Sequence, residues 1–331
     1  MSSENYNITK LWGLNDLAKK EPNDDPMYTW FVDNLSWLED NKLIMSIENP
    51  FGADTDLFLN IGKFKLFKCL ETGFVYANPR LTTEGVNALF ESSMNAYFKV
   101  VEDTYEERFK ISYEPIANEL REIFPSGCKL LEVGCGSGAL LSVLRDVGGF
   151  EVKGVEISPA AIEYHEKRKL DVTLGSVENL SGQDKYDAIV IWSVADHFAD
   201  PSEAFAACFR LLRNGGQIFI ANVNTDGFDI STAGADSQIY APPSRVNFYN
   251  VKSLTKQLKQ TGFKIINHKT PGKLDTAIVR EYWRSGGKNG RNSWLQKILS
   301  EPSDDKIADK LQTFIVDNGL SGFQTVLASK P

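Results

Sequence analysis

Two kinds of hydrophobic pattern take turns along residues 129–270. Short, nearly continuous apolar runs such as 129–133 (KLLEV) and 186–192 (YDAIVIW) are typical of buried strands. Between such runs, apolar residues recur every three or four positions, as in 201–212, which predicts amphipathic helices. Strands that alternate with helices indicate a parallel sheet with helices on both faces. We therefore expect an α/β core in this part of the chain.

Capping residues mark where further helices of this core begin. Ser158 and Pro159 indicate one helix start, and Asp200, Pro201 and Glu203 form a second one of the capping-box kind. The remaining predicted strands are 151–157, 171–175, 215–223 and 263–270, and the remaining predicted helices are 139–148, 159–169 and 251–262. These elements continue the alternating pattern as far as residue 270.

The flanking segments follow other patterns. Residues 1–81 are mixed and contain aromatic strand-like runs, which predicts an N-terminal α+β domain, and residues 82–128 predict a helical cover. Residues 271–321 predict a helical insertion around a glycine-rich loop (RSGGKNGRNS), and residues 322–331 a last core strand. The expected core therefore comprises residues 129–270 and that last strand.

Charge and composition exclude several classes of protein. The chain has 331 residues with 36 basic and 44 acidic side chains, so its formal charge of −8 argues against a nucleic-acid partner. No apolar run is long enough to cross a bilayer, and the first ten residues lack a signal-peptide core. The four cysteines form no CxxC pair, which fits reduced thiols. We expect a cytoplasmic protein without a membrane partner.

The stretch KLLEVGCGSGALL (129–141) predicts a strand, a glycine-rich turn and a helix. Such a turn lets a ligand approach bare backbone at the start of a helix. Its spacing fits GxGxxA, typical of dinucleotide-binding turns, and equally ExGxGxG, typical of turns that bind S-adenosylmethionine (SAM). Both patterns expect an acid at the end of the second strand for ribose hydroxyls, and Glu156 stands there. The glycines alone therefore leave the ligand open.

Glu132, two residues before the first glycine, favours SAM. Beside a dinucleotide's pyrophosphate a carboxylate is a like charge, which weakens binding. Beside SAM, which carries a sulfonium and an ammonium, the same carboxylate attracts. Glu132 therefore disfavours a nicotinamide oxidoreductase.

The successive motifs LLEVGCGSG, GVEIS and YDAIVIWSVADHFADPSEAFAACFRLLRNGGQIFIANVN resemble the class I SAM-dependent methyltransferase family over residues 129–270. The resemblance implies a Rossmann-like methyltransferase sheet, SAM as cofactor and S-adenosylhomocysteine (SAH) as product. It implies that Glu132 steers the methionine amino group, that Glu156 holds the ribose hydroxyls and that Ile157 packs on adenine. The cofactor-binding residues expected in all are Glu132, Gly134, Cys135, Gly136, Gly138, Glu156, Ile157, Ser176, Val177, Glu178, Trp192 and Ser193. Many members carry Asp where this chain has Ser176.

Both flanks resemble a subgroup of these enzymes that is often associated with sugar, polysaccharide or secondary-metabolite modification. KCLETGFVYANPRLTTEGVNALF is similar to the zinc-ribbon lead-in of that subgroup, but Cys69 stands alone and Thr72 replaces its partner. Because a tetrahedral zinc site needs four ligands, we expect the ribbon shape without a metal. Downstream, Arg245 stands where the subgroup usually has His.

His197 is the candidate base for a hydroxyl acceptor, because it follows the fourth strand at the carboxyl end of the sheet. Asp196 is expected to orient His197 or to act itself. The alternative for His197 is a hydrogen bond within its loop, and the alternative for Asp196 is an ordinary solvated place in that loop. His165, on a charged helix, is expected at the solvated surface. Tyr249 and Arg245 are candidate acceptor contacts, although core packing is the more ordinary place for Tyr249.

The glycine-rich loop carries Arg284, Lys288 and Arg291, with Arg280 just before it. One hypothesis makes this loop a lid over an anionic acceptor, and the other makes it an exposed basic loop.

The sequence thus indicates a SAM-dependent methyltransferase acting on a small molecule, most plausibly on a hydroxyl of a sugar or nucleotide-linked sugar. Two alternatives from other classes stay open: a protein or RNA methyltransferase, and a non-catalytic SAM-binding scaffold. The acceptor, the methylated atom and the oligomeric state are not given by the sequence.

Overall fold

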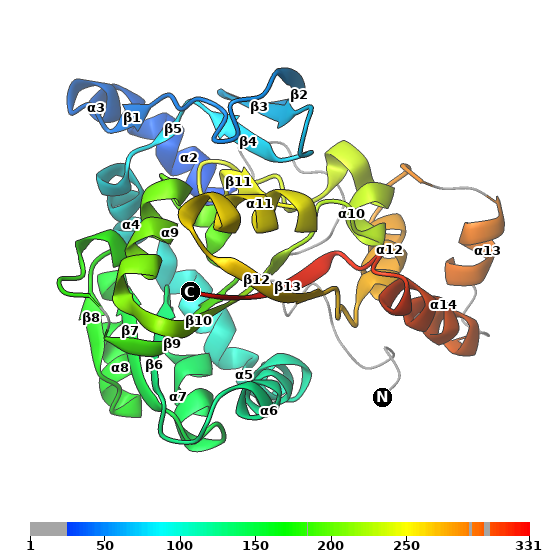
Figure 1. Cartoon of the computed structure of the whole chain (residues 1–331). Coiled ribbons are helices and arrows are strands. Elements are labelled where there is room, and N and C mark those ends of the chain that lie inside the picture. The colour runs from blue at the N-terminus through cyan, green and yellow to red at the C-terminus, as the bar shows by residue number, and fades with distance from the viewer. Residues whose placement is uncertain (1–24, 184, 291–292, 301–304) are drawn as a thin grey trace.

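A seven-stranded sheet forms the centre of the computed structural model, which describes residues 25–183, 185–290, 293–300 and 305–331 (Figure 1). Its strand order is β12-β13-β10-β9-β6-β7-β8, and all strands run parallel except β13. The strands are β6 (Lys129–Val133), β7 (Glu151–Glu156), β8 (Val172–Leu174), β9 (Tyr186–Trp192), β10 (Leu212–Val223), β12 (Lys264–Lys269) and β13 (Phe323–Ser329). The expected α/β, Rossmann-like class is confirmed, and the only antiparallel strand of this sheet is the C-terminal one.

Helices cover both faces of the sheet because side chains along each strand alternate in direction. On one face Leu130 and Val190 pack under α7 (Ala139–Asp146) and α6 (Glu114–Ile123). On the other, Leu131 and Ile189 pack under α9 (Pro201–Leu211) and α11 (Val251–Thr261). The sheet core is therefore buried on both sides, as its nearly continuous apolar strands predicted.

Two of the helix starts differ in how they are capped. Asp200 caps α9 by accepting bonds from the backbone N–H groups of Ser202 (2.8 Å) and Glu203 (3.1 Å), as expected. Ser158 does not cap, because its hydroxyl donates instead to the carbonyl of Phe90 (3.3 Å). The chain there enters a 3₁₀ turn (Pro159–Ala161) before α8 (Ile162–Arg168).

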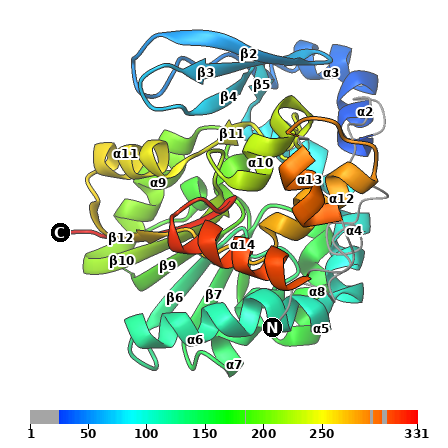
Figure 2. The same ribbon diagram turned by 90° about the vertical axis from the view of Figure 1, so that its right-hand side faces the viewer.

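A second, four-stranded sheet lies beyond one end of the large one in both views (Figures 1 and 2). Its order is β11-β4-β3-β2, with β2 (Thr55–Ile61), β3 (Phe64–Cys69), β4 (Val75–Asn78) and β11 (Asn247–Phe248). Because β11 comes from the segment after β10, the N-terminal residues share a sheet with the α/β part. The short strands β1 (Ile44–Met45) and β5 (Arg80–Leu81) pair beside it, and α2 (Pro26–Asp33) and α3 (Leu35–Asp40) precede it.

Cys69 is fully buried at the end of β3 and is packed in the core with Phe51 and Phe74. Among the described residues no three His, Cys, Asp or Glu side chains gather in a way that could hold a metal ion. None of the helices in the described ranges is long and apolar enough to span a bilayer.

The remaining helices cover the carboxyl edge of the large sheet and its flank. α4 (Thr83–Asp103), α5 (Tyr105–Arg108) and a π-helical turn (Phe109–Tyr113) lead into α6. α12 (Asp275–Arg284), α13 (Ser293–Ser300) and α14 (Asp305–Asp317) form a helical group beside α10 (Phe228–Ala233), coloured orange and red in Figure 2. Single 3₁₀ turns over Val177–Asn179, Ala195–His197 and Gly234–Asp236 complete the described elements.

Candidate active site

A cavity of about 1400 Å³ opens at the carboxyl edge of the parallel strands. In an open α/β sheet this edge is where ligands bind. The lining comes from the turn after β6, the ends of β7, β9 and β10, and the helices α4, α10 and α12. A cavity of this volume exceeds that of an ordinary single-ligand pocket, about 300–1000 Å³, so it has room for two small molecules.

The turn after β6 presents bare backbone to this cavity. Gly134 and Gly136 have positive φ angles of 67° and 54°, and both line the cavity. A Cβ on Gly134 would lie 2.7 Å from the side chain of Val194, so the strand-to-helix turn is tight as well as left-handed. Gly138 also has a positive φ (76°), but it precedes α7 and does not line the cavity.

Two buried carboxyls lie beside this turn. Glu132 is 3% exposed and its Oε2 atom has no hydrogen-bond partner, while Glu156 accepts bonds from the N–H groups of Gly136 and Ser158, both at 2.9 Å. Burial, and next the charge of Glu156, raises the pKa of Glu132 well above its ordinary value. Burial also raises the pKa of Glu156, although its backbone bonds act in the opposite direction. Two buried acids that face one cavity, and that have no basic side chain of the described residues paired with them there, indicate a cationic ligand.

The other expected cofactor residues line the same end of the cavity. They are Cys135, Ile157, Ser176, Val177, Glu178, Trp192 and Ser193. The hydroxyl of Ser176 is buried without a partner, and Ser193 has a positive φ of 54° at the end of β9. A non-glycine residue held in that backbone region is a feature that clusters at functional sites. Burial raises the pKa of the Cys135 thiol well above its ordinary value, so Cys135 is no thiolate nucleophile.

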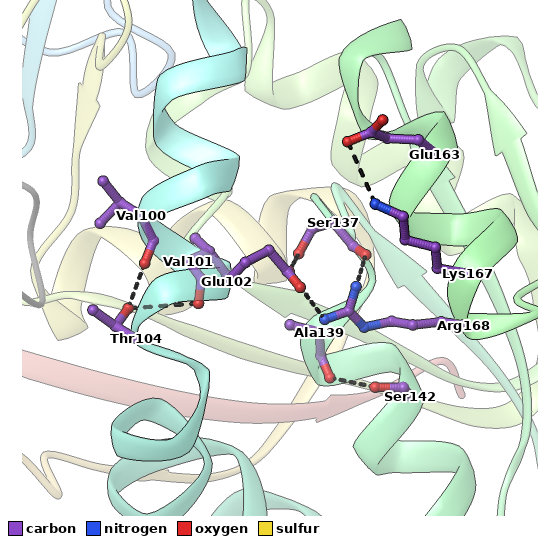
Figure 3. Close-up of polar contacts among 10 residues, drawn as sticks. All are labelled: Val100, Val101, Glu102, Thr104, Ser137, Ala139, Ser142, Glu163, Lys167 and Arg168. Carbon is purple, nitrogen blue, oxygen red and sulfur yellow. Dashed lines mark hydrogen bonds and ion pairs between the residues drawn. The ribbon is translucent and has the colours of Figure 1, made fainter.

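Side chains from two helices hold the glycine turn from outside (Figure 3). Glu102 of α4 accepts a bond from the hydroxyl of Ser137 (2.9 Å) and pairs with Arg168 of α8 (2.6 Å). His165, also on α8, donates from Nε2 to the carbonyl of Gly136 (2.6 Å), since a carbonyl oxygen only accepts. The expectation of a solvated His165 is therefore wrong: it is 7% exposed because α8 turns it onto the glycine turn.

His197, Asp196 and Arg245 form one cluster at the far side of β9. His197 lines the cavity and its Nδ1 lies 2.7 Å from the carbonyl oxygen of Ser244. Nε2 lies 3.8 Å from Asp196, whose other oxygen pairs with Nε of Arg245 at 3.3 Å. Asp196 is buried and does not itself line the cavity. Burial lowers the pKa of His197, with Asp196 opposing and Arg245 adding to the shift.

Two expected acceptor contacts lie elsewhere. Tyr249 is fully buried with its ring 4.7 Å from that of Phe74, so it belongs to the core between the two sheets. Arg284 points to solvent, with 69% of its side chain exposed, and pairs with Glu281. Neither lines the cavity, and nor does Lys288; Arg291 lies outside the described residues. Arg280 is bonded to the carbonyl of Leu299. The insertion does cover the cavity, but through the inner face of α12, with Asp275, Ile278 and Tyr282.

Among the lining acids that were not foreseen from the sequence, two are buried: Asp229 on α10 and Asp275 on α12. Asp229 follows the end of β10 within a few residues, a position at the ligand-binding edge that could have drawn attention to it. Nothing in the local sequence marks Asp275, because its place depends on how the insertion folds back.

Comparison with known proteins agrees with this geometry. Residues 105–268 match the family described as Methyltransferase domain. The chain carries a SAM-dependent methyltransferase domain. This domain is 30% identical over 121 residues to the ubiquinone biosynthesis O-methyltransferase of Thiobacillus denitrificans, covering 34% of this chain and 52% of that protein. The match thus spans about half the length of that relative.

Two further likenesses extend the comparison beyond the methyltransferase domain. An uncharacterised protein of Methanocaldococcus jannaschii is 29% identical over 203 residues, which covers 59% of this chain and 96% of that protein. Among solved structures, the complex of the Haloferax volcanii Trm112 methyltransferase activator and a methyltransferase contains a chain with a TM-score of 0.52 at 15% identity. That likeness covers 72% of this chain and 98% of the other, and it concerns the fold alone.

Proposed function

We propose that this protein transfers a methyl group from SAM to a hydroxyl of a small-molecule acceptor held in the same cavity. The observation that carries the proposal is the pair Glu132 and Glu156, buried beside the glycine turn and facing the cavity that His197 also lines. The Thiobacillus relative is named as an O-methyltransferase, which supports a hydroxyl acceptor.

The residues of the turn suit the donor in charge and in shape. Glu132 has an unpartnered Oε2 atom that the ammonium of SAM would satisfy, and Glu156 would accept bonds from ribose hydroxyls. Ile157 and the buried, unpartnered hydroxyl of Ser176 would contact adenine. When bound, SAM supplies an electrophilic methyl on its sulfonium. The protein's own task is then to align the acceptor and to exclude water.

His197 is placed to take the acceptor's proton. Because Nδ1–H donates to Ser244, Nε2 carries the free lone pair of the neutral ring. The lowered pKa of His197 keeps this ring neutral at physiological pH, as a base requires. Asp196 is a positioning residue in this proposal, because it lies beside the ring of His197 without lining the cavity. Arg245 lines the cavity and pairs with Asp196, so it acts on His197 through that carboxylate.

The cavity favours a small acceptor over a macromolecule. Side chains from α4, α10 and α12 surround it, so an acceptor must enter rather than lie across a surface. A sugar hydroxyl is our proposed target, supported by the likeness of both flanks to methyltransferases of sugar modification. An anionic acceptor is disfavoured, because the basic residues of the glycine-rich loop that the structure describes do not line the cavity.

Calorimetric titration with SAM, SAH and NAD tests the donor site. We expect micromolar binding of both adenosyl ligands and none of NAD. Glu132→Gln should weaken SAM about 10- to 100-fold, since a hydrogen bond to a charged group contributes about 1.5–3 kcal/mol. SAM binding should also release a proton, because a nearby cation favours the ionised form of Glu132.

Glu151→Gln, at the exposed start of β7, is the matched control and should bind SAM like the wild type. Binding of NAD alone, or unchanged SAM affinity in Glu132→Gln, would contradict the proposed donor site.

A further inference from the structure

Asp229 and Asp275 meet at one end of the cavity although 46 positions separate them in the chain. Asp229 lies in α10 after β10, and Asp275 begins α12 after β12. The turn before β13, with Ser321 and Gly322, lies between them and also lines the cavity. Three separate segments of the carboxyl edge therefore build this end of the cavity.

Glycines let these segments approach closely. A Cβ on Gly322 would lie 1.9 Å from Oδ1 of Asp229, and one on Gly272 would lie 1.8 Å from Oγ of Ser321. A Cβ on Gly227 would lie 2.1 Å from Cα of Gly322. Any larger residue would push the two acids apart.

The two carboxyls have different partners. Asp275 accepts bonds from the Gly322 N–H (2.6 Å), the Gln312 amide (2.6 Å) and the Ser321 hydroxyl (2.9 Å). These three donors fix the position of the Asp275 carboxyl group. Asp229 is 8% exposed, lines the cavity, and its Oδ1 atom has no partner. Burial, and next the charge of Asp275, raises the pKa of Asp229 to about 7.

The charges around the cavity point to the kind of group that would satisfy Asp229. Acidic side chains outnumber basic ones in its lining: Asp25, Glu119, Glu132, Glu156, Glu178, Asp229, Asp236 and Asp275 against Arg108, Arg245 and Lys273. Arg245 is paired with Asp196, and Lys273 is exposed and bonded to the carbonyl of Ile111. A cation at Asp229 would offset both the burial of its carboxylate and its repulsion from Asp275.

We propose that Asp229, supported by Asp275, binds a protonated amine of the acceptor. This inference rests on the proposed function, because it places the acceptor's amine at the end of the cavity that bound SAM would leave open. The acceptor is then a small hydroxyl compound that also carries an ammonium group, such as one of the amino-sugar class. Asp229 touches the acceptor and fixes which compounds bind, while Asp275 is a positioning residue that acts through it.

Pairs of probes that differ only in the amine test this inference on the SAH-saturated full chain at pH 7. The pairs are n-butylamine and n-butanol, tyramine and 4-ethylphenol, and glucosamine and glucose. Calorimetry should show at least one amine binding about tenfold or more tightly than its neutral partner. In Asp229→Asn this ratio should fall to about one, because the isosteric amide carries no charge.

Asp226→Asn is the matched control: Asp226 is exposed in the same connection after β10, does not line the cavity, and its replacement should keep the ratio. The SAH affinity of each variant shows whether it is folded and whether the donor site works. If the wild-type protein does not bind SAH, the proposed function is contradicted. Normal SAH binding with no amine preferred in any pair, or an unchanged ratio in Asp229→Asn, would overturn the amine subsite.

Discussion

The proton of His197 sits on Nδ1, because that nitrogen lies 2.7 Å from a carbonyl oxygen that can only accept. This leaves the lone pair on Nε2, which lies 3.8 Å from Asp196, with Phe90 packed edge-on against the ring at 5.9 Å. A histidine that is merely fixed in its loop would take no proton from the acceptor, so the two interpretations of His197 differ in what they predict for activity.

We expect His197→Gln to lower kcat/KM about 10²- to 10⁴-fold, the usual contribution of a general base. In the wild type the rate should fall as the pH drops through the pKa of His197, which burial places below the ordinary 6.5, and the variant should lose this acid limb. Initial rates between pH 5 and 8, with a hydroxyl acceptor that supports turnover, measure both effects.

His268→Gln is the control, since His268 is exposed on β12. Activity of His197→Gln within a few-fold of this control would show that His197 is structural.

At this scale the sequence predicts residues whose role follows from local chemistry and order along the chain. Gly134 and Gly136 of the glycine turn line the cavity, and so do Glu132 and Glu156, because the end of a parallel strand fixes where its next residues lie. The burial of His165 could not be predicted, because a helix composed mainly of charged residues has no apolar stripe that marks its buried face. Tyr249 was open to both interpretations, since an aromatic next to the ligand edge packs equally well into a core.

Helices α4 and α8 support the donor site together, because side chains of the two helices bond to each other and to the glycine turn. The Glu102 carboxylate joins both of them to the glycine turn, and Arg168 also packs over the ring of Tyr105 (5.7 Å). The Glu102 and Arg168 side chains are only 27% and 17% exposed, so water screens their ion pair less than it would a surface pair. The turn is therefore held in its ligand-binding shape before SAM arrives.

Glu102→Gln should weaken SAM and SAH binding about three- to tenfold, because the amide still bonds Ser137 but no longer pairs with Arg168. We expect the KM for SAM to rise while kcat and the acceptor KM stay unchanged. Glu163→Gln removes an exposed ion pair with Lys167 on α8, drawn in Figure 3, whose charged atoms are 3.8 Å apart. This variant should change neither SAM binding nor the KM for SAM. Equal effects of the two variants would show that the link between α4 and the turn does not position SAM.

The helical insertion shows that a sequence pattern can predict a helix without predicting which face of that helix lines a cavity. Its helices could be predicted from their apolar period, but not which side of α12 faces the cavity. The structure turns Asp275, Ile278 and Tyr282 inward and leaves Arg284 in water. Arg284 and Lys288 of the basic loop, which the sequence offered as contacts to an anionic acceptor, therefore do not line the cavity. Arg284 is exposed and pairs with Glu281 instead.

At the scale of the whole molecule, the small sheet and the α/β part form one interlocked body. β11, from the segment after β10, completes the sheet that β2, β3 and β4 begin. Arg80 is fully buried between them and donates to the carbonyls of Ala199 (3.2 Å) and Val246 (2.9 Å) and to the side chain of Asn247 (2.8 Å). The sequence predicted an N-terminal α+β domain from the mixed pattern and aromatic strand-like runs of residues 1–81, and such a local pattern carries no sign of a strand that returns from far along the chain.

Arg80→Met should therefore destabilise the entire chain, and not its N-terminal part alone. The substitution removes the Arg80 donor from the buried carbonyls of Ala77 and Ala199 and from the Asn247 amide oxygen, and each unsatisfied group costs about 1–3 kcal/mol. The Val246 carbonyl keeps its bond from the Ala77 N–H. We expect a loss of at least about 3 kcal/mol in the free energy of unfolding. In urea, tryptophan fluorescence reports on the N-terminal helices when the other four of the six tryptophans are replaced by phenylalanine and only Trp30 and Trp37 remain. Release of SAH reports on the donor site. The urea midpoints of both signals should fall together, because the strands they depend on share Arg80.

Arg284→Met, which removes an exposed charge, is the control and should change the free energy of unfolding by no more than about 0.5 kcal/mol with either signal. If the tryptophan signal moved while SAH release kept its wild-type midpoint, the N-terminal sheet would unfold independently, and the donor site would not depend on it.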